Sequence, residues 1–134
     1  MLRYMLDTNL CIRVLRDRPA SARQRFNENS EGLCISTIVL TELLHGAAKS
    51  ARPVENRRAV EDFAARLEML PFDEAAADHA ADIRAELERK GAVIGAYDLL
   101  IAGHARSKGL ALVTGNLGEF RRVEGLRCED WLES

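Results

Sequence analysis

The hydrophobic positions along the chain follow two different spacings, and each spacing predicts a type of element. Short, mainly apolar runs stand at 3–6, 33–36 and 111–114, which favours buried strands. Between and after these runs, apolar residues return every three or four positions, as on one face of a helix. This spacing predicts helices over 9–16, 19–29, 54–70 and 73–90, another helix from about Ala96, and a further strand near 69–72.

Several of the predicted boundaries coincide with residues that start or stop helices. Pro19 stands near the first turn of the helix over 19–29, Pro53 precedes the next, and Gly91 follows the helix over 73–90. The segment TIVLTELLHGAAK at 37–49 is apolar on nearly every side and predicts a buried helix. Because strands alternate with helices, right-handed crossovers should build an α/β fold with a mainly parallel sheet covered by helices.

Length and composition fit one soluble domain over residues 1–134. With 47% hydrophobic and 30% charged residues, the chain can bury a core of its own. Arg3 and Asp7 interrupt the first apolar run, so it is no signal peptide, and no run approaches the ~18 apolar residues of a membrane span. We therefore expect a cytoplasmic protein without membrane contact, in which the three well-separated cysteines are small buried hydrophobes.

The net charge of −2 does not mark a nucleic-acid binder, but the basic residues are unevenly distributed. Residues 1–27 contain six arginines against two aspartates. Guanidinium groups suit phosphate oxygens, so this segment is either a rim that contacts a nucleic-acid backbone or a solvated helix face. Composition alone favours the solvated face.

Polar residues follow two of the predicted strands at their carboxyl ends. Asp7 comes directly after the first run, while Thr114 ends the run at 111–114, with Asn116 and Glu119 just beyond it. Ligands collect at the carboxyl ends of parallel strands, so these side chains meet if the two strands are neighbours. Capping of the following helix is the alternative role for Asp7.

Two further carboxylates stand on predicted helices. Glu42 interrupts a mainly apolar helix, where a carboxylate must be hydrated at a cleft, paired or metal-bound. Asp98 follows Gly95 and opens a helix, where stabilising the helix dipole is its alternative role. Converging carboxylates repel one another, and oxygen donors without a Cys/His cluster suit Mg²⁺ or Mn²⁺, which can activate water against a phosphodiester.

The motifs around these acids, taken in order, resemble one protein family. The sequence has Asp-Thr-Asn at 7–9, STIVLTELLHGA around Glu42, GAYDLLIAGHA around Asp98, and VTGNLGEF before the terminal GLRCEDWL. Together they resemble a PIN domain of the VapC toxin type over essentially the whole chain. The resemblance implies a three-layer α/β/α fold and the toxin of a type II toxin–antitoxin system. Such a toxin is a metal-dependent endoribonuclease that cuts structured RNA, commonly transfer RNA, leaves a 5′-phosphate and a 3′-hydroxyl, and stops translation.

The resemblance also implies a role for each acid. Asp7 and Asp98 would be direct ligands of Mg²⁺, for which Mn²⁺ can substitute, and Glu42 and Glu119 would act directly or through metal-bound water. Three polar residues would support the carboxylates and waters: Asn9, Thr114 and Asn116. The chain departs from the family pattern at Gly115 and Gly118, which widen the backbone freedom of the loop before Glu119.

The family likeness implies partners as well. Such toxins usually form a homodimer and are silenced by a VapB-type antitoxin whose tail lies over the acidic groove. Surplus negative charge in that groove would attract an arginine of the tail. Operator DNA is expected to bind only through the antitoxin.

Two other functions are compatible with parts of this pattern. A phosphoaspartate phosphatase also places an aspartate after its first strand, but it needs a second acid two residues later, where this chain has Asn9. A catalytically silent PIN-like module that binds a partner protein or RNA remains the alternative. The presence of Asp7, Glu42 and Asp98 argues against it, because a silent domain has no physical need for clustered acids.

Overall fold

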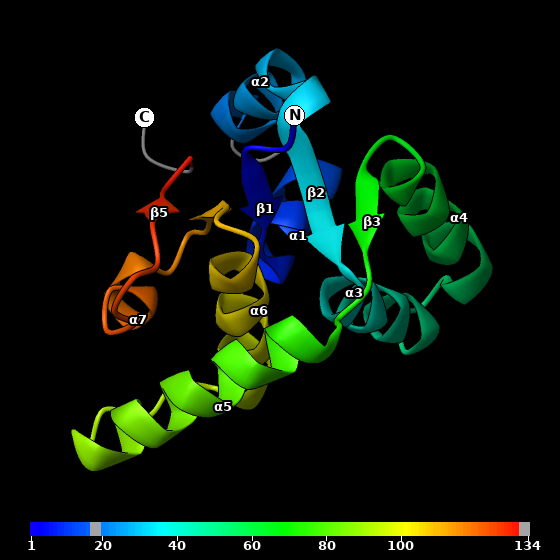
Figure 1. Cartoon of the computed structure of the whole chain (residues 1–134). Coiled ribbons are helices and arrows are strands. Elements are labelled where there is room, and N and C mark those ends of the chain that lie inside the picture. Colours follow the sequence, from blue (N-terminus) through cyan, green and yellow to red (C-terminus); the bar gives the residue numbers. More distant parts are fainter. Residues whose placement is uncertain (17–19, 132–134) are drawn as a thin grey trace.

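Short strands alternate with helices in the computed structural model, which describes residues 1–16 and 20–131. The strands are β1 (Tyr4–Leu6), β2 (Leu33–Ser36), β3 (Glu68–Leu70), β4 (Ala111–Val113) and β5 (Cys128–Glu129). The helices are α1 (Thr8–Arg16), α2 (Ala20–Glu28), α3 (Thr37–Ala48), α4 (Pro53–Ala64), α5 (Glu74–Arg89), α6 (Ala96–Ser107) and α7 (Leu117–Phe120), with a 3-10 turn at Ser30–Gly32 (Figure 1). Pro19, predicted near the start of the second helix, lies outside the described residues.

The described strands form one sheet in the order β3-β2-β1-β4-β5, and all neighbouring pairs are parallel. The predicted α/β fold with a mainly parallel sheet is therefore confirmed. Because β1 pairs with β4, Leu6 is aligned with Val113, and the backbone N–H of Asp7 donates to the Val113 carbonyl at 3.0 Å. The carboxyl ends of these two strands lie side by side, as the predicted site required.

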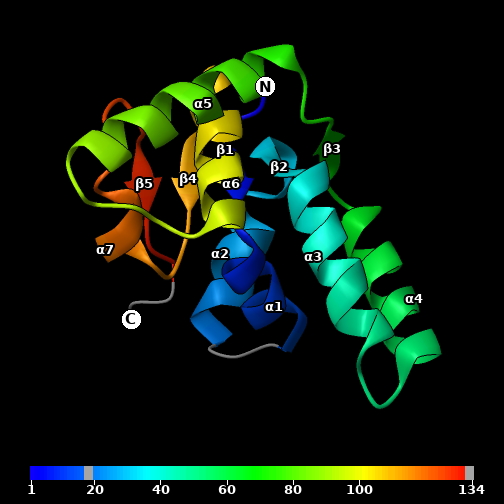
Figure 2. The same ribbon diagram turned by 90° about the horizontal axis from the view of Figure 1, so that it is seen from below.

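Helices cover both faces of the sheet. Figure 2 shows α1 and α2 on one side of the strands and α5 with α6 on the other. The predicted inner face of α5 is buried along its length, through Ala76, Ala80, Ile83 and Leu87. Gly103 of α6 allows the two helices to approach closely, because a Cβ at this position would lie 2.6 Å from Cα of Ala80.

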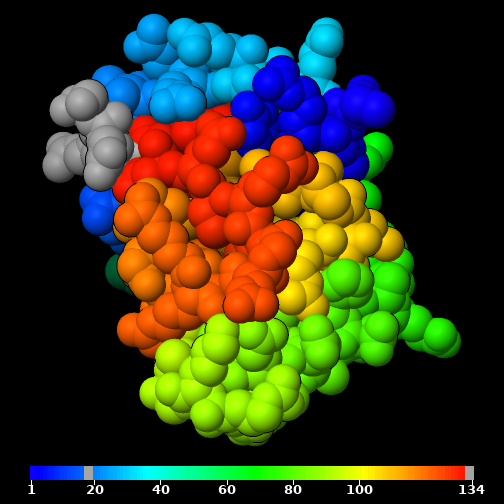
Figure 3. Space-filling model, turned by 60° about the vertical axis from the view of Figure 1, so that its left-hand side comes forward, coloured from blue at the N-terminus to red at the C-terminus, as the bar shows by residue number. Residues whose placement is uncertain are grey.

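The C-terminal edge of the sheet is held by an aromatic contact. Trp131 is fully buried, with its ring edge-on to that of Tyr4 at 5.2 Å between centroids and the Arg25 guanidinium 5.2 Å from its ring centre. Its indole N–H donates to Glu129 of β5 at 3.2 Å. Figure 3 shows this C-terminal segment, orange to red, lying between α2 and α5 on one face of the molecule. These contacts hold β5 beside β4.

One predicted helix is too long. The helix predicted over 54–70 ends at Ala64 as α4, and the strand predicted near 69–72 forms slightly earlier, as β3 over Glu68–Leu70. Glu68 pairs with Cys34 of β2, and Leu67 packs against the core. Pairing with the sheet therefore outweighs the good helix propensity of this segment.

The helix α3 is buried on one side only, which corrects the prediction of a buried helix. Its buried residues are Val39, Leu43 and Ala47, whereas Thr41 and His45 are exposed. A helix this apolar usually lies inside a protein, but here several apolar side chains are only partly covered. The open side of α3 gives solvent access to the turn that carries Glu42.

Two smaller predictions concern the cysteines and the membrane. Cys11 and Cys34 are buried, as predicted, while Cys128 is only half-buried, and all three are free thiols. Burial raises the pKa of Cys34 to about 12, so its thiol stays protonated at neutral pH. Among the described residues, no helix is both long enough and apolar enough to cross a membrane.

Candidate active site

Asp7 lies at the carboxyl end of β1, where its side chain has two roles at once. One carboxylate oxygen accepts the backbone N–H of Leu10 at 2.8 Å, which caps the first turn of α1. The same carboxylate accepts a hydrogen bond from the side chain of Thr114, at the end of β4. Asp7 is only 3% exposed. Asp7 therefore caps α1 and also contacts the end of β4, so the capping role does not exclude the predicted role in a site.

Glu42 enters the site from α3. The hydroxyl of Thr8, in the first turn of α1, donates to a Glu42 carboxylate oxygen at 2.5 Å and so joins α1 to α3. The start of α3 is fixed by Ser36, whose hydroxyl oxygen accepts the backbone N–H of Ile38 at 3.0 Å. His104 of α6 places its Nδ1 2.8 Å from the same hydroxyl. Two hydrogen-bonded contacts therefore position the helix that carries Glu42.

Asp98 lies in the first turn of α6, as predicted, and Gly95 at the helix N-cap leaves room for it. A Cβ on Gly95 would stand 3.3 Å from a carboxylate oxygen of Asp98. On its other side, Asp98 shares a hydrogen bond with the carboxyl of Glu119 in α7. The site thus brings together one acid after a strand and three acids from three different helices.

Glu119 is oriented by the loop that precedes it. The side-chain amide of Asn116 donates to a Glu119 carboxylate oxygen at 2.6 Å. The backbone N–H of Asn116 donates to the hydroxyl oxygen of Thr114 at 2.8 Å. Because Thr114 also contacts Asp7, one chain of hydrogen bonds links Glu119 to the end of β1. This loop geometry forms despite Gly115 and Gly118.

The surroundings of Asp7 favour its protonated form. Burial raises its pKa from 3.8 to about 6, and the charges of Glu42 and Asp130 act in the same direction. The hydrogen bonds from Thr114 and Leu10 oppose this shift, because they stabilise the carboxylate. Burial and neighbouring negative charge together outweigh them.

The pKa of Asp98 is raised further than that of Asp7. Burial has the largest effect, the hydrogen bond and charge of Glu119 come next, and the charges of Asp7 and Glu42 add to them. The pKa of Asp98 rises from 3.8 to about 7. Asp98 therefore lies within electrostatic reach of the other three predicted acids.

The donors in this cluster suit a hard cation. They are carboxylate oxygens, which Mg²⁺ and Mn²⁺ prefer, and the raised pKa values of Asp7 and Asp98 are those expected where positive charge is needed. Within residues 1–16 and 20–131, no three His, Cys, Asp or Glu side chains already form a group that could hold a metal ion. The acids converge, with Asp98 and Glu119 in direct hydrogen-bonded contact.

Some residues differ in role from the sequence prediction. Asn9 is exposed on α1, and it is its neighbour Thr8 that contacts Glu42. The Asp-Thr-Asn motif indicated that polar residues of this turn support the acids, but the sequence does not show which of their side chains faces α3. Asp130 was not predicted at all, although it directly follows β5 and its charge acts on Asp7. The rule that ligands collect at strand ends could have found it.

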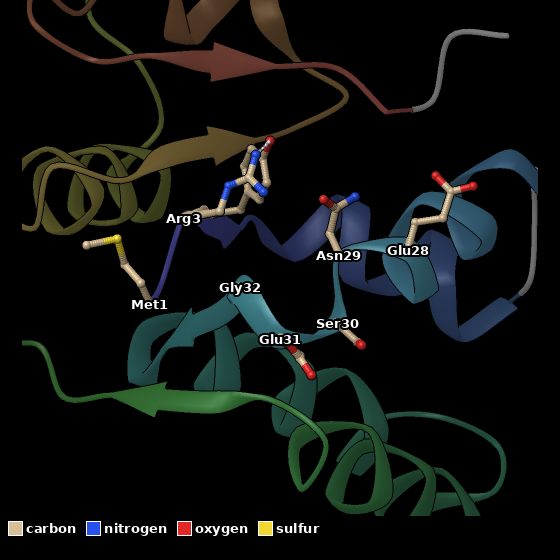
Figure 4. A pocket seen from close by; sticks show the side chains of 8 residues that line it. Met1, Arg3, Glu28, Asn29, Ser30, Glu31 and Gly32 are labelled. Atoms are coloured by element: carbon tan, nitrogen blue, oxygen red, sulfur yellow. Dashed lines mark hydrogen bonds between the residues drawn. The ribbon is translucent and has the colours of Figure 1, made fainter.

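Several cavities open on the described part of the molecule, at different places around the sheet. A groove of about 840 Å³ opens beside the acids, and its lining includes Thr8, Glu42 and Tyr97. Another cavity, of about 450 Å³, lies before the amino ends of β1 and β2 (Figure 4). Its two acids, Glu28 and Glu31, point in different directions, so no set of polar groups converges there. The groove beside the acids is therefore the candidate substrate site.

Comparison with known proteins agrees with this placement. The PIN domain family model matches residues 4–126. The tRNA(fMet)-specific endonuclease VapC of Shigella flexneri is 53% identical over 131 residues, which is 98% of this chain and 99% of the relative. The DNA-bound VapBC structure from Salmonella typhimurium aligns with a TM-score of 0.94 at 53% identity, covering 98% of this chain and 99% of the other.

A more distant structure has the same fold. VapBC2 from Rickettsia felis, bound to a DNA fragment from its promoter, aligns with a TM-score of 0.91 at 37% identity. The alignment covers 97% of this chain and 99% of the other, so no large element is added or missing in either. The chain therefore belongs to the PIN domain family and, within it, to the VapC group.

Proposed function

We propose that this chain is the toxin of a type II toxin–antitoxin pair and a metal-dependent endoribonuclease that cuts structured RNA, transfer RNA in particular, and so inhibits translation. The observation that carries the proposal is Asp98, which shares a hydrogen bond with Glu119 and lies within reach of two further acids. Carboxylates that raise one another's pKa add nothing to the stability of a fold, so their convergence favours a catalytic role. The name of the Shigella relative supports transfer RNA as the substrate class.

Mg²⁺, with Mn²⁺ as a substitute, is the cofactor in this proposal. Asp7, Glu42, Asp98 and Glu119 would hold it directly or through water, because their oxygens are the donors that hard cations prefer. When bound, the ion would polarise the phosphodiester and supply hydroxide for a hydrolysis that leaves a 5′-phosphate and a 3′-hydroxyl.

The chain's own polar residues fix where the carboxylates point. Thr8 holds Glu42, Thr114 holds Asp7, and the Asn116 amide holds Glu119. Each of these bonds restricts a side chain that would otherwise sample several rotamers. A bound cation would therefore meet a largely preorganised set of oxygens, which reduces the cost of ordering the site during the reaction.

The partners follow from the family. We propose a homodimer in the cytoplasm that is silenced by a VapB-type antitoxin and reaches operator DNA only through it. The DNA-bound VapBC complexes from Salmonella typhimurium and Rickettsia felis support this part of the proposal. The groove beside the acids is large enough for a peptide segment, and the negative charge at its end would attract an arginine.

The first experiment tests cleavage directly. Purified, antitoxin-free protein is incubated with total bacterial transfer RNA in Mg²⁺, in Mn²⁺ and in EDTA, and the ends of the fragments are mapped. The variants are Asp98→Asn and Asp78→Asn. The second is the matched control, because it makes the same change at an exposed position of α5.

We expect metal-dependent cuts with 5′-phosphate ends from the parent and from Asp78→Asn. Asp98→Asn should lose at least about a hundredfold in rate, since an amide lacks the negative charge and one of the oxygens with which Asp98 would hold the cation. Cleavage that survives Asp98→Asn would refute the carboxylate mechanism. An absence of cleavage under every metal would favour the silent PIN-like module.

A further inference from the structure

Tyr97 is the exposed aromatic residue nearest in sequence to the acid cluster. It lies in the first turn of α6, directly before Asp98, so the two Cα atoms are ~3.8 Å apart. Its side chain lines the groove that also contains Thr8 and Glu42. The ring therefore lines the same groove as Glu42, and it does so from the helix turn that carries Asp98.

Packing does not explain a tyrosine at this position. Tyr97 is 51% exposed, and it is the one aromatic among the large exposed hydrophobic residues of the described chain, which are Met1, Val54, Val93 and Tyr97. An aromatic ring stabilises a fold through the area that it buries, and Tyr97 leaves half of that area in water. An exposed ring beside a reactive centre is available to a ligand.

The remainder of the groove lining is partly apolar, through residues such as Leu15 and Val60, and partly polar or basic. It includes two cations, Arg16 and Lys49, together with His45 and polar side chains of α3 and α4. Cations that follow a groove contact phosphates, and aromatic rings within it stack on unpaired bases. An antitoxin segment is the other macromolecule that would fit, but these two cations favour a polyanion.

We propose that Tyr97 is a specificity-determining residue, whose ring stacks on the base next to the cleaved phosphodiester while the RNA backbone follows the groove past Lys49 and Arg16. This inference rests on the proposed ribonuclease function and extends it. Proteins read RNA mainly at loops whose bases are unstacked, and a ring beside the acids would select such a loop for cleavage. Tyr97 would then decide where cleavage occurs, while the acids perform it.

Binding and cleavage are measured separately to test this. Binding of fluorescently labelled total bacterial transfer RNA is followed in EDTA with Asp98→Asn protein, so that neither metal nor turnover contributes. Tyr97→Leu removes the ring, Tyr97→Phe keeps it, and Val93→Ala changes an exposed residue outside the groove lining. Melting temperatures establish that each variant is folded.

We expect Tyr97→Leu to weaken binding about tenfold, in line with the loss of one stacked base, while Tyr97→Phe restores it to within about twofold. Val93→Ala should bind as its parent does. With Asp98 intact, Tyr97→Leu should raise KM about tenfold, change kcat little, and spread cleavage over more positions.

Unchanged binding and an unchanged cleavage map in Tyr97→Leu would overturn the inference, as would a loss of kcat alone. A variant that binds RNA normally but no longer binds the antitoxin would assign the ring to the protein partner instead. If the parent itself fails to cut RNA, it is the proposed function that fails. An active parent that is indifferent to Tyr97→Leu refutes this inference only.

Discussion

The helix α6 takes part in two regions of opposite character. In its second half, Gly103 packs against Ala80 of α5 so closely that the contact has no room for an added Cβ. At its first turn, Asp98 is held beside other acids that raise its pKa to about 7. The first region stabilises the fold, whereas the second costs stability at neutral pH. The close packing of α6 against α5 thus offsets the electrostatic cost of holding Asp98 beside the other acids.

The largest expected effect comes from disturbing the packed contact. Gly103→Ala places a Cβ 2.6 Å from backbone atoms of Ala80, so the two helices must move apart, at a cost of about 2–3 kcal/mol of unfolding free energy. Gly46→Ala is the matched control, since it lies within α3 and its Cβ would meet nothing within 4 Å. Urea denaturation measures both. Equal stability of the two variants would show that α5 and α6 are not closely packed.

A smaller effect of opposite sign is expected at the acids. Asp98 has a higher pKa in the folded chain, about 7, than its ordinary value of 3.8, so the folded state binds more protons between these values. Stability is therefore greatest below pH 3.8 as far as this group is concerned, and is lost as the pH rises through about 7. Asp98→Asn removes this loss.

We expect Asp98→Asn to melt about 3 °C above the parent at pH 8 in EDTA, which corresponds to roughly 1 kcal/mol after allowance for solvent screening. At pH 5 the difference in melting temperature between Asp98→Asn and the parent should become small. Thermal denaturation at both pH values measures it, with Asp78→Asn as the control. A gap that is the same at pH 5 and pH 8 would contradict the raised pKa.

The smallest effect concerns the loop that carries Glu119. Gly118 lies within the short helix α7, and a Cβ there would meet nothing within 4 Å. Gly118→Ala should therefore stabilise the chain by roughly 0.5 kcal/mol, because alanine restricts the unfolded backbone more than glycine does. Chemical denaturation measures the change. A loss of stability would indicate that this loop needs the freedom of glycine.

The sequence predicted the sheet because its strands are short apolar runs that end at polar residues. Leu33–Ser36 is such a run, and its bounds agree with the prediction. The meeting of Asp7 with Thr114 followed from a general property of parallel sheets once β1 and β4 were assumed to be neighbours. The strand near 69–72 was predicted too, but the end of α4 at Ala64 was not, because the start of β3 at Glu68 depends on its pairing with Cys34 in the folded sheet.

The acids of the site could be predicted, but the side chains that orient them could not. Glu42 was identifiable because a carboxylate in an apolar helix needs a partner. That its partner is Thr8 rather than Asn9 depends on how α1 lies against α3, which local sequence does not encode. The contact between His104 and Ser36 is of the same kind, since 68 positions separate the two residues in the chain.

The buried Trp131 gives this molecule an optical reporter of its own. It is the single tryptophan of the chain, and it lies against Tyr4 with the Arg25 guanidinium over its ring, just beyond β5. Indole emission shifts to longer wavelength when such a ring reaches water. Intrinsic fluorescence therefore records the release of β5 separately from the helical signal in circular dichroism, so that fraying of the sheet at this edge can be distinguished from global unfolding without any label.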